Sequence, residues 1–174
     1  ENNGIQTIAK KAFYDCDKLE TFYVASEDVE AIGESAFEDC SSLTSITIPK
    51  NVTYIGENAF RGCISITSII VDKDNPRYDS RNNCNAIIWK NTLELGCQNS
   101  FIPQGVTSIA DGAFEDCTSL ESINIPDSVT HIGQNAFYNT GIYNNNSNWS
   151  KGFLYIDKCL IAVKEIKQRN LHSN

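Results

Sequence analysis

Apolar residues recur in this chain at intervals of about 23 residues, always in the same order of residue types. The clearest mark is an Ala-Phe pair, at 12–13, 36–37, 59–60, 113–114 and 136–137, so that the steps are 24, 23, 54 and 23 residues. A motif that binds a cofactor usually occurs once in a chain, whereas a motif that recurs about every 20 to 50 residues is typical of stacked structural repeats. The period therefore predicts a solenoid.

Other positions of the unit also keep one kind of residue. Aliphatic residues stand seven and four positions before each Ala: Ile5, Val29, Val52, Val106 and Val129, then Ile8, Ile32, Ile55, Ile109 and Ile132. Three residues after each Phe comes Cys16, Cys40, Cys63 or Cys117, and only Thr140 breaks this pattern. Because so short a unit cannot bury its apolar positions alone, neighbouring units must stack into a continuous core.

The period-two alternation in "LTSITIP" (43–49) and "LESINIP" (120–126) predicts one short strand in each repeat. The inward residues would be Phe22 and Val24, Ile46 and Ile48, Ile69 and Val71, and Ile123 and Ile125. The segment "GESAFEDC" (33–40) is too short for a free-standing helix, so we expect a single helical or 3₁₀ turn with Phe as its plug. The predicted fold class is a repeat solenoid with short parallel strands on one face and short helical turns on the other.

The 54-residue step is a repeat plus an insertion, which predicts a β-hairpin over about 72–99 with its turn near Lys90-Asn91. Cys84 and Cys97 are equally far from that turn and would face each other, which makes a disulfide possible but not required. A second hairpin is expected over 152–164 about Asp157-Lys158, and the Asn-rich segment 139–152 before it should form turns and loops.

The whole chain, 1–174, is thus predicted to be one repeat domain. Its repeats would span 5–28, 29–51, 52–105 with the insertion, 106–128 and 129–174. The chain enters in mid-repeat without a polar cap, which predicts a mature or truncated fragment of a longer protein.

The consensus matches a known family. The pattern Leu43-x-x-Ile46-x-Ile48-Pro49-x-x-Val52-x-x-Ile55-Gly56-x-x-Ala59-Phe60-x-x-Cys63 resembles the BspA-like leucine-rich repeats, and the resemblance extends from Ile5 to about Phe137. The insertion also resembles the sequence of insertions that are common in this family, at Asn75-Pro76, Tyr78, Ser80 and Asn85 to Ile88. The resemblance implies a curved or twisted solenoid, a location at the cell surface or outside the cell, and adhesion to host matrix proteins or other cells. It does not imply catalysis.

Charge and cysteine content narrow the function classes. The net charge of −8 argues against a nucleic-acid partner, and no run of Lys or Arg or long apolar stretch suggests a membrane. Repeat cysteines about 23 residues apart are typical of buried small side chains, and the alternative of a zinc or redox site has only His131 and His172 to support it. No cofactor is expected.

Other candidate chemistry is weak. Side-chain oxygens that could bind calcium occur close together in one segment, at Asp72, Asp74, Asn75 and Asp79. Pro76 and Arg77 do not fit the EF-hand pattern, however, which favours a loop whose acidic side chains are solvated. His131 occupies a position that varies among repeats, so it should be exposed. There is no Gly-rich phosphate loop or G-x-S-x-G motif, and the prediction is a protein that is not an enzyme.

The outward face of the strands remains, together with the inserted hairpin, as the candidate binding surface. The residues predicted to contact a partner are Thr21, Tyr23, Thr47, Ile70, Phe101 and Asn124. Aromatic and aliphatic anchors among them favour recognition of a protein or glycan on host or neighbouring cells. The alternative, favoured by the many Ser and Thr residues beside them, is a structural spacer that presents another domain.

Overall fold

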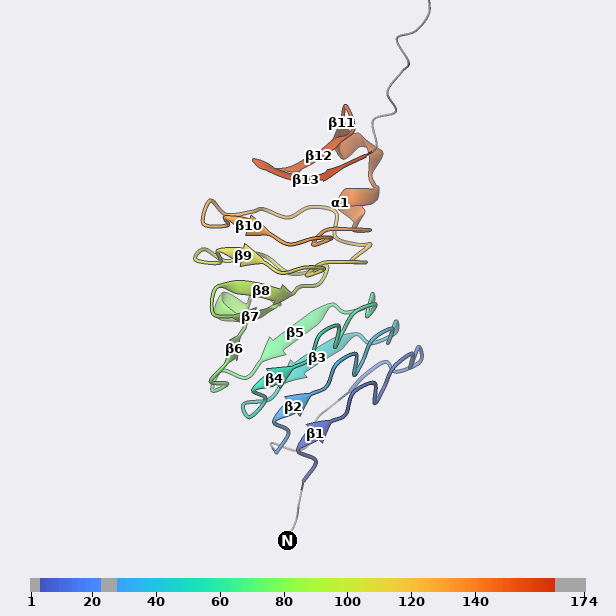
Figure 1. The fold of residues 1–174 in the computed structure, drawn as a ribbon, viewed down its shortest axis with the longest axis vertical. Coiled ribbons are helices and arrows are strands. Elements are labelled where there is room, and N and C mark those ends of the chain that lie inside the picture. Colours follow the sequence, from blue (N-terminus) through green and yellow to red (C-terminus); the bar gives the residue numbers. More distant parts are fainter. Residues whose placement is uncertain (1–3, 23–27, 165–174) are drawn as a thin grey trace, which may run out of the picture.

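The computed structural model describes residues 4–22 and 28–164, which form two stacks of repeats joined by an inserted hairpin (Figure 1). In the first stack, β1 (Thr7–Ile8), β2 (Ala31–Ile32) and β4 (Tyr54–Ile55) form a parallel sheet. Beside it, β3 (Ser45–Ile48) and β5 (Ser68–Val71) form a second parallel pair. The second and third repeats therefore each contribute to parallel ladders on two sides of the solenoid.

The insertion begins with β6 (Tyr78–Asp79) and a 3₁₀ turn, η1 (Arg81–Asn83), and continues through β7 (Ile87–Trp89) and β8 (Thr92–Leu95). The strand β8 pairs antiparallel with β7 on one side and parallel with β9 (Ser108–Ile109) on the other. Because β10 (His131–Ile132) then follows β9, the second strand of the hairpin starts the second stack.

The carboxyl-terminal part folds against the second stack. Helix α1 (Gly141–Asn144) and η2 (Asn146–Asn148) precede a three-stranded antiparallel sheet of β11 (Trp149–Ser150), β12 (Phe153–Ile156) and β13 (Cys159–Val163). Ile156 pairs with Cys159, which confirms the predicted hairpin about 157–158. The segment 139–152 is more regular than predicted, because Thr140 is buried and its hydroxyl accepts from the Tyr143 N–H (3.1 Å), which caps α1.

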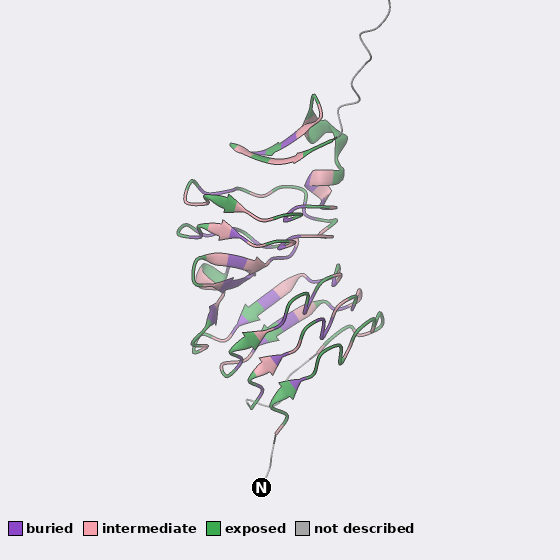
Figure 2. Ribbon diagram, in the orientation of Figure 1, coloured by how far each residue is buried: buried purple, intermediate pink, exposed green. Residues whose placement is uncertain are grey.

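The Phe residues of the repeat form columns through the core. Phe37 stacks almost parallel on Phe13 and on Phe60, with ring centroids 5.0 and 5.3 Å apart. In the second stack Phe114 and Phe137 lie 5.2 Å apart in the same way. The predicted role of Phe as the plug of each turn is therefore confirmed. Figure 2 shows buried residues in both stacks of repeats.

The sequence predicted a helical or 3₁₀ turn around each Phe, but the structure has no helix there. The N–H groups of Ala36, Glu38 and Cys40 donate to the carbonyls three residues earlier, each at 3.2 Å, so that three tight turns overlap. Ser35 and Asp39 provide the positive φ (54° and 62°) that such turns use. A helical segment would satisfy its N–H groups internally, whereas this arrangement frees alternate N–H groups to bond to the next repeat.

The strand predicted at 120–126 does not form. The short strands β1, β2, β4, β9 and β10, which the pattern did not predict, form ladders instead. Two-residue strands leave no alternation to detect in the sequence, since they comprise only an exposed or half-buried residue and an Ile.

The Gly of the repeat lies directly against the preceding repeat. A Cβ atom on Gly56 would come within 2.3 Å of the Glu34 nitrogen, and one on Gly33 within 2.5 Å of the Lys10 nitrogen. Ala110 occupies this position in the repeat that follows the insertion, where the hairpin strand β8 precedes it in place of a regular repeat. The position requires Gly where it packs on a regular repeat, and accepts Ala after the hairpin.

The predicted opposition of Cys84 and Cys97 was wrong. Near the turn the pairs Trp89–Thr92 and Ile88–Leu93 follow the expected register, but a bulge then shifts Ile87 to Leu95. Both cysteines are buried and free, and they belong to different core clusters. An irregularity of one residue is enough to send the two thiols to different sides.

Candidate interaction surfaces

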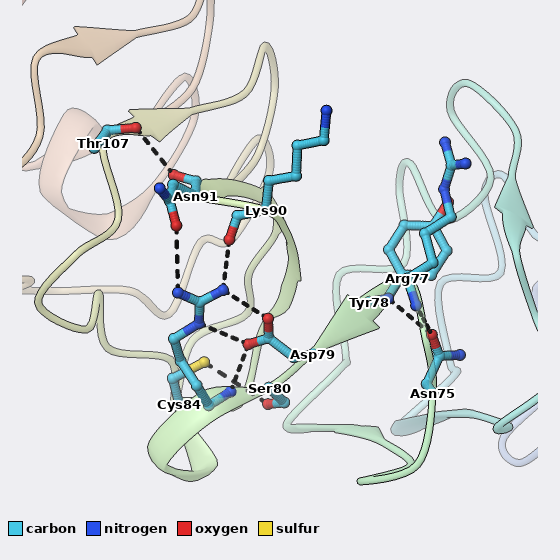
Figure 3. Close-up of polar contacts among 10 residues, drawn as sticks. Asn75, Arg77, Tyr78, Asp79, Ser80, Cys84, Lys90, Asn91 and Thr107 are labelled. Atoms are coloured by element: carbon cyan, nitrogen blue, oxygen red, sulfur yellow. Dashed lines mark hydrogen bonds and ion pairs between the residues drawn. The ribbon is translucent and has the colours of Figure 1, made fainter.

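The insertion closes the first stack by using side chains in place of a further strand. The Asn75 amide group donates to the carbonyls of Pro49 (2.8 Å) and Val52 (2.9 Å). Its oxygen accepts from the N–H groups of Arg77 and Tyr78, as Figure 3 shows. Asn75, which the sequence pattern disfavours as a calcium ligand, is therefore part of a backbone cap.

Two further side chains complete this closure. The Tyr78 hydroxyl accepts from the Ile55 N–H (3.1 Å), at the edge of β4. Asn85 accepts from the Ile69 N–H and donates to the Thr67 carbonyl (2.8 Å), at the edge of β5. Backbone groups that would otherwise form an open edge are thus paired, which removes a template for aggregation.

A charged network holds the hairpin in place. Arg81 makes a bidentate ion pair with Asp79, with Nε–Oδ1 and Nη2–Oδ2 distances of 2.8 and 2.6 Å. The guanidinium also donates to the Lys90 carbonyl and the Asn91 side chain, beside Thr107 of the next repeat (Figure 3). The hydrogen bond with Asp79 raises the pKa of Arg81, so this cation stays charged and anchors the turn.

The outer surface of the hairpin combines an aromatic ring with cations. Arg77 and Lys90 are exposed and lie over the half-buried Trp89 ring, 4.7 and 4.9 Å from its centroid. The strand β7, which carries Trp89, contacts β5. This hairpin surface, Arg77, Trp89 and Lys90, is a basic and aromatic patch on an acidic protein.

The predicted strand-face residues are exposed wherever the structure describes them: Thr21, Thr47, Ile70, Phe101 and Asn124. Tyr23 lies outside the described residues. The β3–β5 register places Thr47 beside Ile70, which is 55% exposed. Phe101 and Asn124 are not in strands, because the segments that carry them have irregular neighbours.

Phe101 nevertheless lies near β5. The Asn99 side chain, two residues earlier, donates to the Thr67 carbonyl just before β5 (3.1 Å), and the Phe101 N–H donates to the Cys84 carbonyl (3.1 Å). Phe101 is 45% exposed. The resumed repeat thus presents an exposed aromatic ring two residues after a contact with Thr67, which precedes β5.

Repeat cysteines form hydrogen bonds in addition to packing in the core. The Cys40 thiol donates to the Phe13 carbonyl (3.1 Å) and the Cys63 thiol to the Phe37 carbonyl (3.0 Å), each in the preceding repeat. Burial raises the pKa of Cys63 and Cys117 to about 12. Neutral thiols are poor nucleophiles and metal ligands, which supports a structural role.

The remaining candidate groups do not form a site. Asp72 accepts from the Asp74 N–H (2.9 Å), and Asp74 pairs with Lys73 (2.9 Å). His131 is exposed, as predicted. Within residues 4–22 and 28–164, no three His, Cys, Asp or Glu side chains are grouped to hold a metal ion, and no helix is long and apolar enough to span a bilayer.

A cleft of about 460 Å³ lies between the third repeat and the start of the second stack. Residues 55–64 form one wall, and residues 94–97 and 110–117 line the other side. Arg61 Nε and Glu115 Oε2 meet across it at 3.2 Å. The sequence showed no signal for this cleft, because it arises from the way the insertion separates the two stacks.

Three solved structures share this architecture. A leucine-rich cell surface protein from Faecalibacterium prausnitzii A2-165 is 32% identical, with a TM-score of 0.61 over 78% of this chain and 37% of its own. The pneumococcal vaccine antigen PcpA is 24% identical, with a TM-score of 0.65 over 78% of this chain and 35% of its own. A leucine-rich repeat protein from Eubacterium ventriosum ATCC 27560 is 23% identical, with a TM-score of 0.50 over 79% and 50%. The last two similarities show the fold alone.

The chain spans between about a third and a half of the length of these proteins. A comparison with curated proteins found no match. The BspA type leucine-rich repeat region matches residues 2–87 and 89–174, in six copies. With the repeat core and the two stacks, this match shows that the chain belongs to the BspA-type leucine-rich repeat family, a repeat protein of bacterial surface-protein type.

Proposed function

We propose that this chain is a non-enzymatic interaction module of a cell-surface or secreted protein, which binds host matrix proteins or surface glycans through its strand face and inserted hairpin. The observation that carries this proposal is the exposure of Ile70 (55%) and Phe101 (45%), large apolar side chains whose backbone segments are each hydrogen-bonded to a neighbouring segment. Large apolar side chains held on a fixed backbone lose little conformational entropy when they bind.

The hairpin surface supports the same proposal. Aromatic rings stack on sugar rings and on apolar side chains, while Arg77 and Lys90 would attract acidic groups of a partner. The Arg81 network fixes the turn that carries Lys90, so this surface is organised before binding.

The competing function is a structural spacer. It is favoured by the polar residues that accompany the anchors, such as Ser45, Thr47 and Ser68 on β3 and β5. A spacer would need no binding hot spot, and its outer residues would be replaceable without loss.

The test is binding of the purified chain to an array of matrix proteins and cell-surface glycans. We would compare it with Ile70→Ser/Phe101→Ser, with Arg77→Ala/Lys90→Ala, and with a control, Tyr14→Ser/Tyr54→Ser, whose rings are 43% and 53% exposed elsewhere. Loss of at least tenfold in either of the first two variants, with an unchanged control, would support the proposed surfaces. Absence of any specific binding would favour the spacer.

A further inference from the structure

The turn side of the solenoid carries a regular hydrogen-bond ladder between repeats. In the first stack, the N–H groups of residues 35, 37 and 39 donate to the carbonyls of residues 57, 59 and 61 at 2.7–2.9 Å. In the second stack, those of residues 112, 114 and 116 donate to residues 134, 136 and 138 at 2.8–3.0 Å. Each repeat therefore offers three donors to its successor, at alternate residues.

This ladder is interrupted at the cleft. The corresponding donors of the third repeat, the N–H groups of Asn58, Phe60 and Gly62, have no acceptor in the part of the chain that the structure describes. On the facing wall the Gly96 N–H holds the carbonyl of Ala113 (2.8 Å), the middle one of the three. The outer two, of Asp111 and Glu115, receive no hydrogen bond from any described residue.

The cleft is also acidic. Its charged lining residues are Glu57, Arg61, Glu94, Asp111 and Glu115, and Arg61 already neutralises Glu115 through their ion pair. Asp111 accepts a hydrogen bond from the Gln134 N–H (2.7 Å). Acidic walls disfavour a bound anion, so the three free N–H donors are not suited to phosphate or sulfate.

Glu94 has the least satisfied carboxylate of the cleft. It is half-buried, and no described residue forms a hydrogen bond or an ion pair with it. Burial raises the pKa of Glu94, and Arg77 opposes this shift only through longer-range attraction. A cation placed beside this carboxylate would restore its ionised form.

We propose that this cleft binds an extended segment of a partner polypeptide that carries a basic side chain. The segment would accept hydrogen bonds from the N–H groups of Asn58, Phe60 and Gly62, because an extended chain presents carbonyls at alternate residues. Its own N–H groups would donate to the Asp111 and Glu115 carbonyls, and its Lys or Arg would pair with Glu94. Addition of a strand to an open backbone edge is a common mode of peptide recognition.

The experiment uses an array of acetylated and amidated nonapeptides, each with a central Lys among Ser, Thr and Val, and a matched array with Glu in place of Lys. The best Lys peptide is then titrated into ¹⁵N-labelled protein, together with a version N-methylated at alternate residues. We expect shifts and slowed exchange at the amides of Asn58, Phe60 and Gly62. Glu94→Gln should weaken binding about tenfold or more, because it removes a charge-assisted hydrogen bond, while the exposed control Glu121→Gln should not.

The site is independent of the proposed strand face, so Ile70→Ser/Phe101→Ser should bind the same peptide with unchanged affinity. The matrix array with that double variant tests the proposed strand face, and the peptide titration tests the cleft. The failure of one proposal can therefore be distinguished from the failure of the other. Three outcomes would overturn the proposal: equal binding of the Glu peptides, full binding of the N-methylated peptide, or no change at the three amides up to millimolar peptide.

Discussion

The two stacks contain nearly the same phrase with different outcomes. "LTSITIP" in the first stack contains the strand β3, whereas "LESINIP" in the second contains no strand. β3 lies beside β5, a segment of the same length and register. Residues 120–126 lie between irregular neighbours, and the Ile125 N–H is held by the Asp157 carboxylate (2.7 Å). A strand in this solenoid is thus a property of two matching neighbours more than of one sequence.

The largest expected difference between the stacks concerns the Phe columns. Phe37→Ala should lower the free energy of unfolding by about 3–5 kcal/mol, since Phe37 is stacked on both sides and also contacts Phe22 (4.8 Å). Phe137→Ala should cost less, because Phe114 is the one aromatic ring among the described residues that stacks on Phe137. Urea unfolding followed by circular dichroism measures both. Equal losses would mean that the columns are not the source of the difference.

The next effect concerns the Gly that contacts the preceding repeat. Gly56→Ala should destabilise by about 1–3 kcal/mol, because the new methyl group overlaps the backbone of Glu34. Ala110→Gly in the second stack should cost only about 0.5–1 kcal/mol, through backbone entropy. The same unfolding measurement compares them, and a larger loss for Ala110→Gly would contradict this account.

Alkaline pH should weaken both stacks through their cysteines. In the unfolded chain the thiols ionise near a pKa of 9.0, whereas folded Cys63 and Cys117 stay protonated up to a pKa of about 12. The unfolded state therefore loses protons first, and stability falls as pH rises between these values. The expected slope is about 1.4 kcal/mol per pH unit for each thiol.

Cysteine variants assign that slope to one stack or the other. Cys63→Ala and Cys117→Ala should each remove about half of the stability loss between pH 10 and 11 that these two thiols cause, and the double variant all of it. The comparison is made by urea titration at each pH. An unchanged slope in the double variant would show that other groups cause the alkaline loss.

The smallest effect concerns the side-chain bond to residue 125. Asp157→Ala should cost about 1 kcal/mol and speed amide exchange at Ile125, while Ile48 in β3 keeps its protection. Asp157→Asn retains an acceptor oxygen and serves as the matched control. Slow exchange at Ile125 in the alanine variant would indicate that another group satisfies this N–H.

The sequence predicted the features that each repeat carries in itself. The Phe columns, the burial of Cys40 and Cys63 and the turn at Asp157 follow from residue type and spacing, whereas the repeat cysteines Cys16 and Cys117 are only half-buried. The sequence could not predict features that depend on neighbouring repeats. The bulge at Ile87 depends on how β8 joins the second stack, and the absence of a strand at 120–126 depends on what lies beside it.

The same distinction applies to the candidate surfaces. Exposure of Thr47 and Ile70 could be predicted from alternation, because side chains of a strand point to opposite faces. The inserted hairpin was predicted to take part in binding, but the grouping of Arg77 and Lys90 on Trp89 could not be predicted, and neither could the cleft. Both require knowledge of which insertion residues replace the missing backbone. Asn75, Tyr78 and Asn85 were visible as a motif, but their role as caps became clear only from their partners.

Closure of the first stack by Asn75, Tyr78 and Asn85 has a consequence for protein engineering. A hairpin that ends one array and begins the next acts as a connector, because it presents side chains to the array before it and a strand to the array after it. Arrays of different length could be exchanged on either side of such a connector without redesign of the opposite partner. The insertion thus makes this solenoid modular at a scale larger than the single repeat.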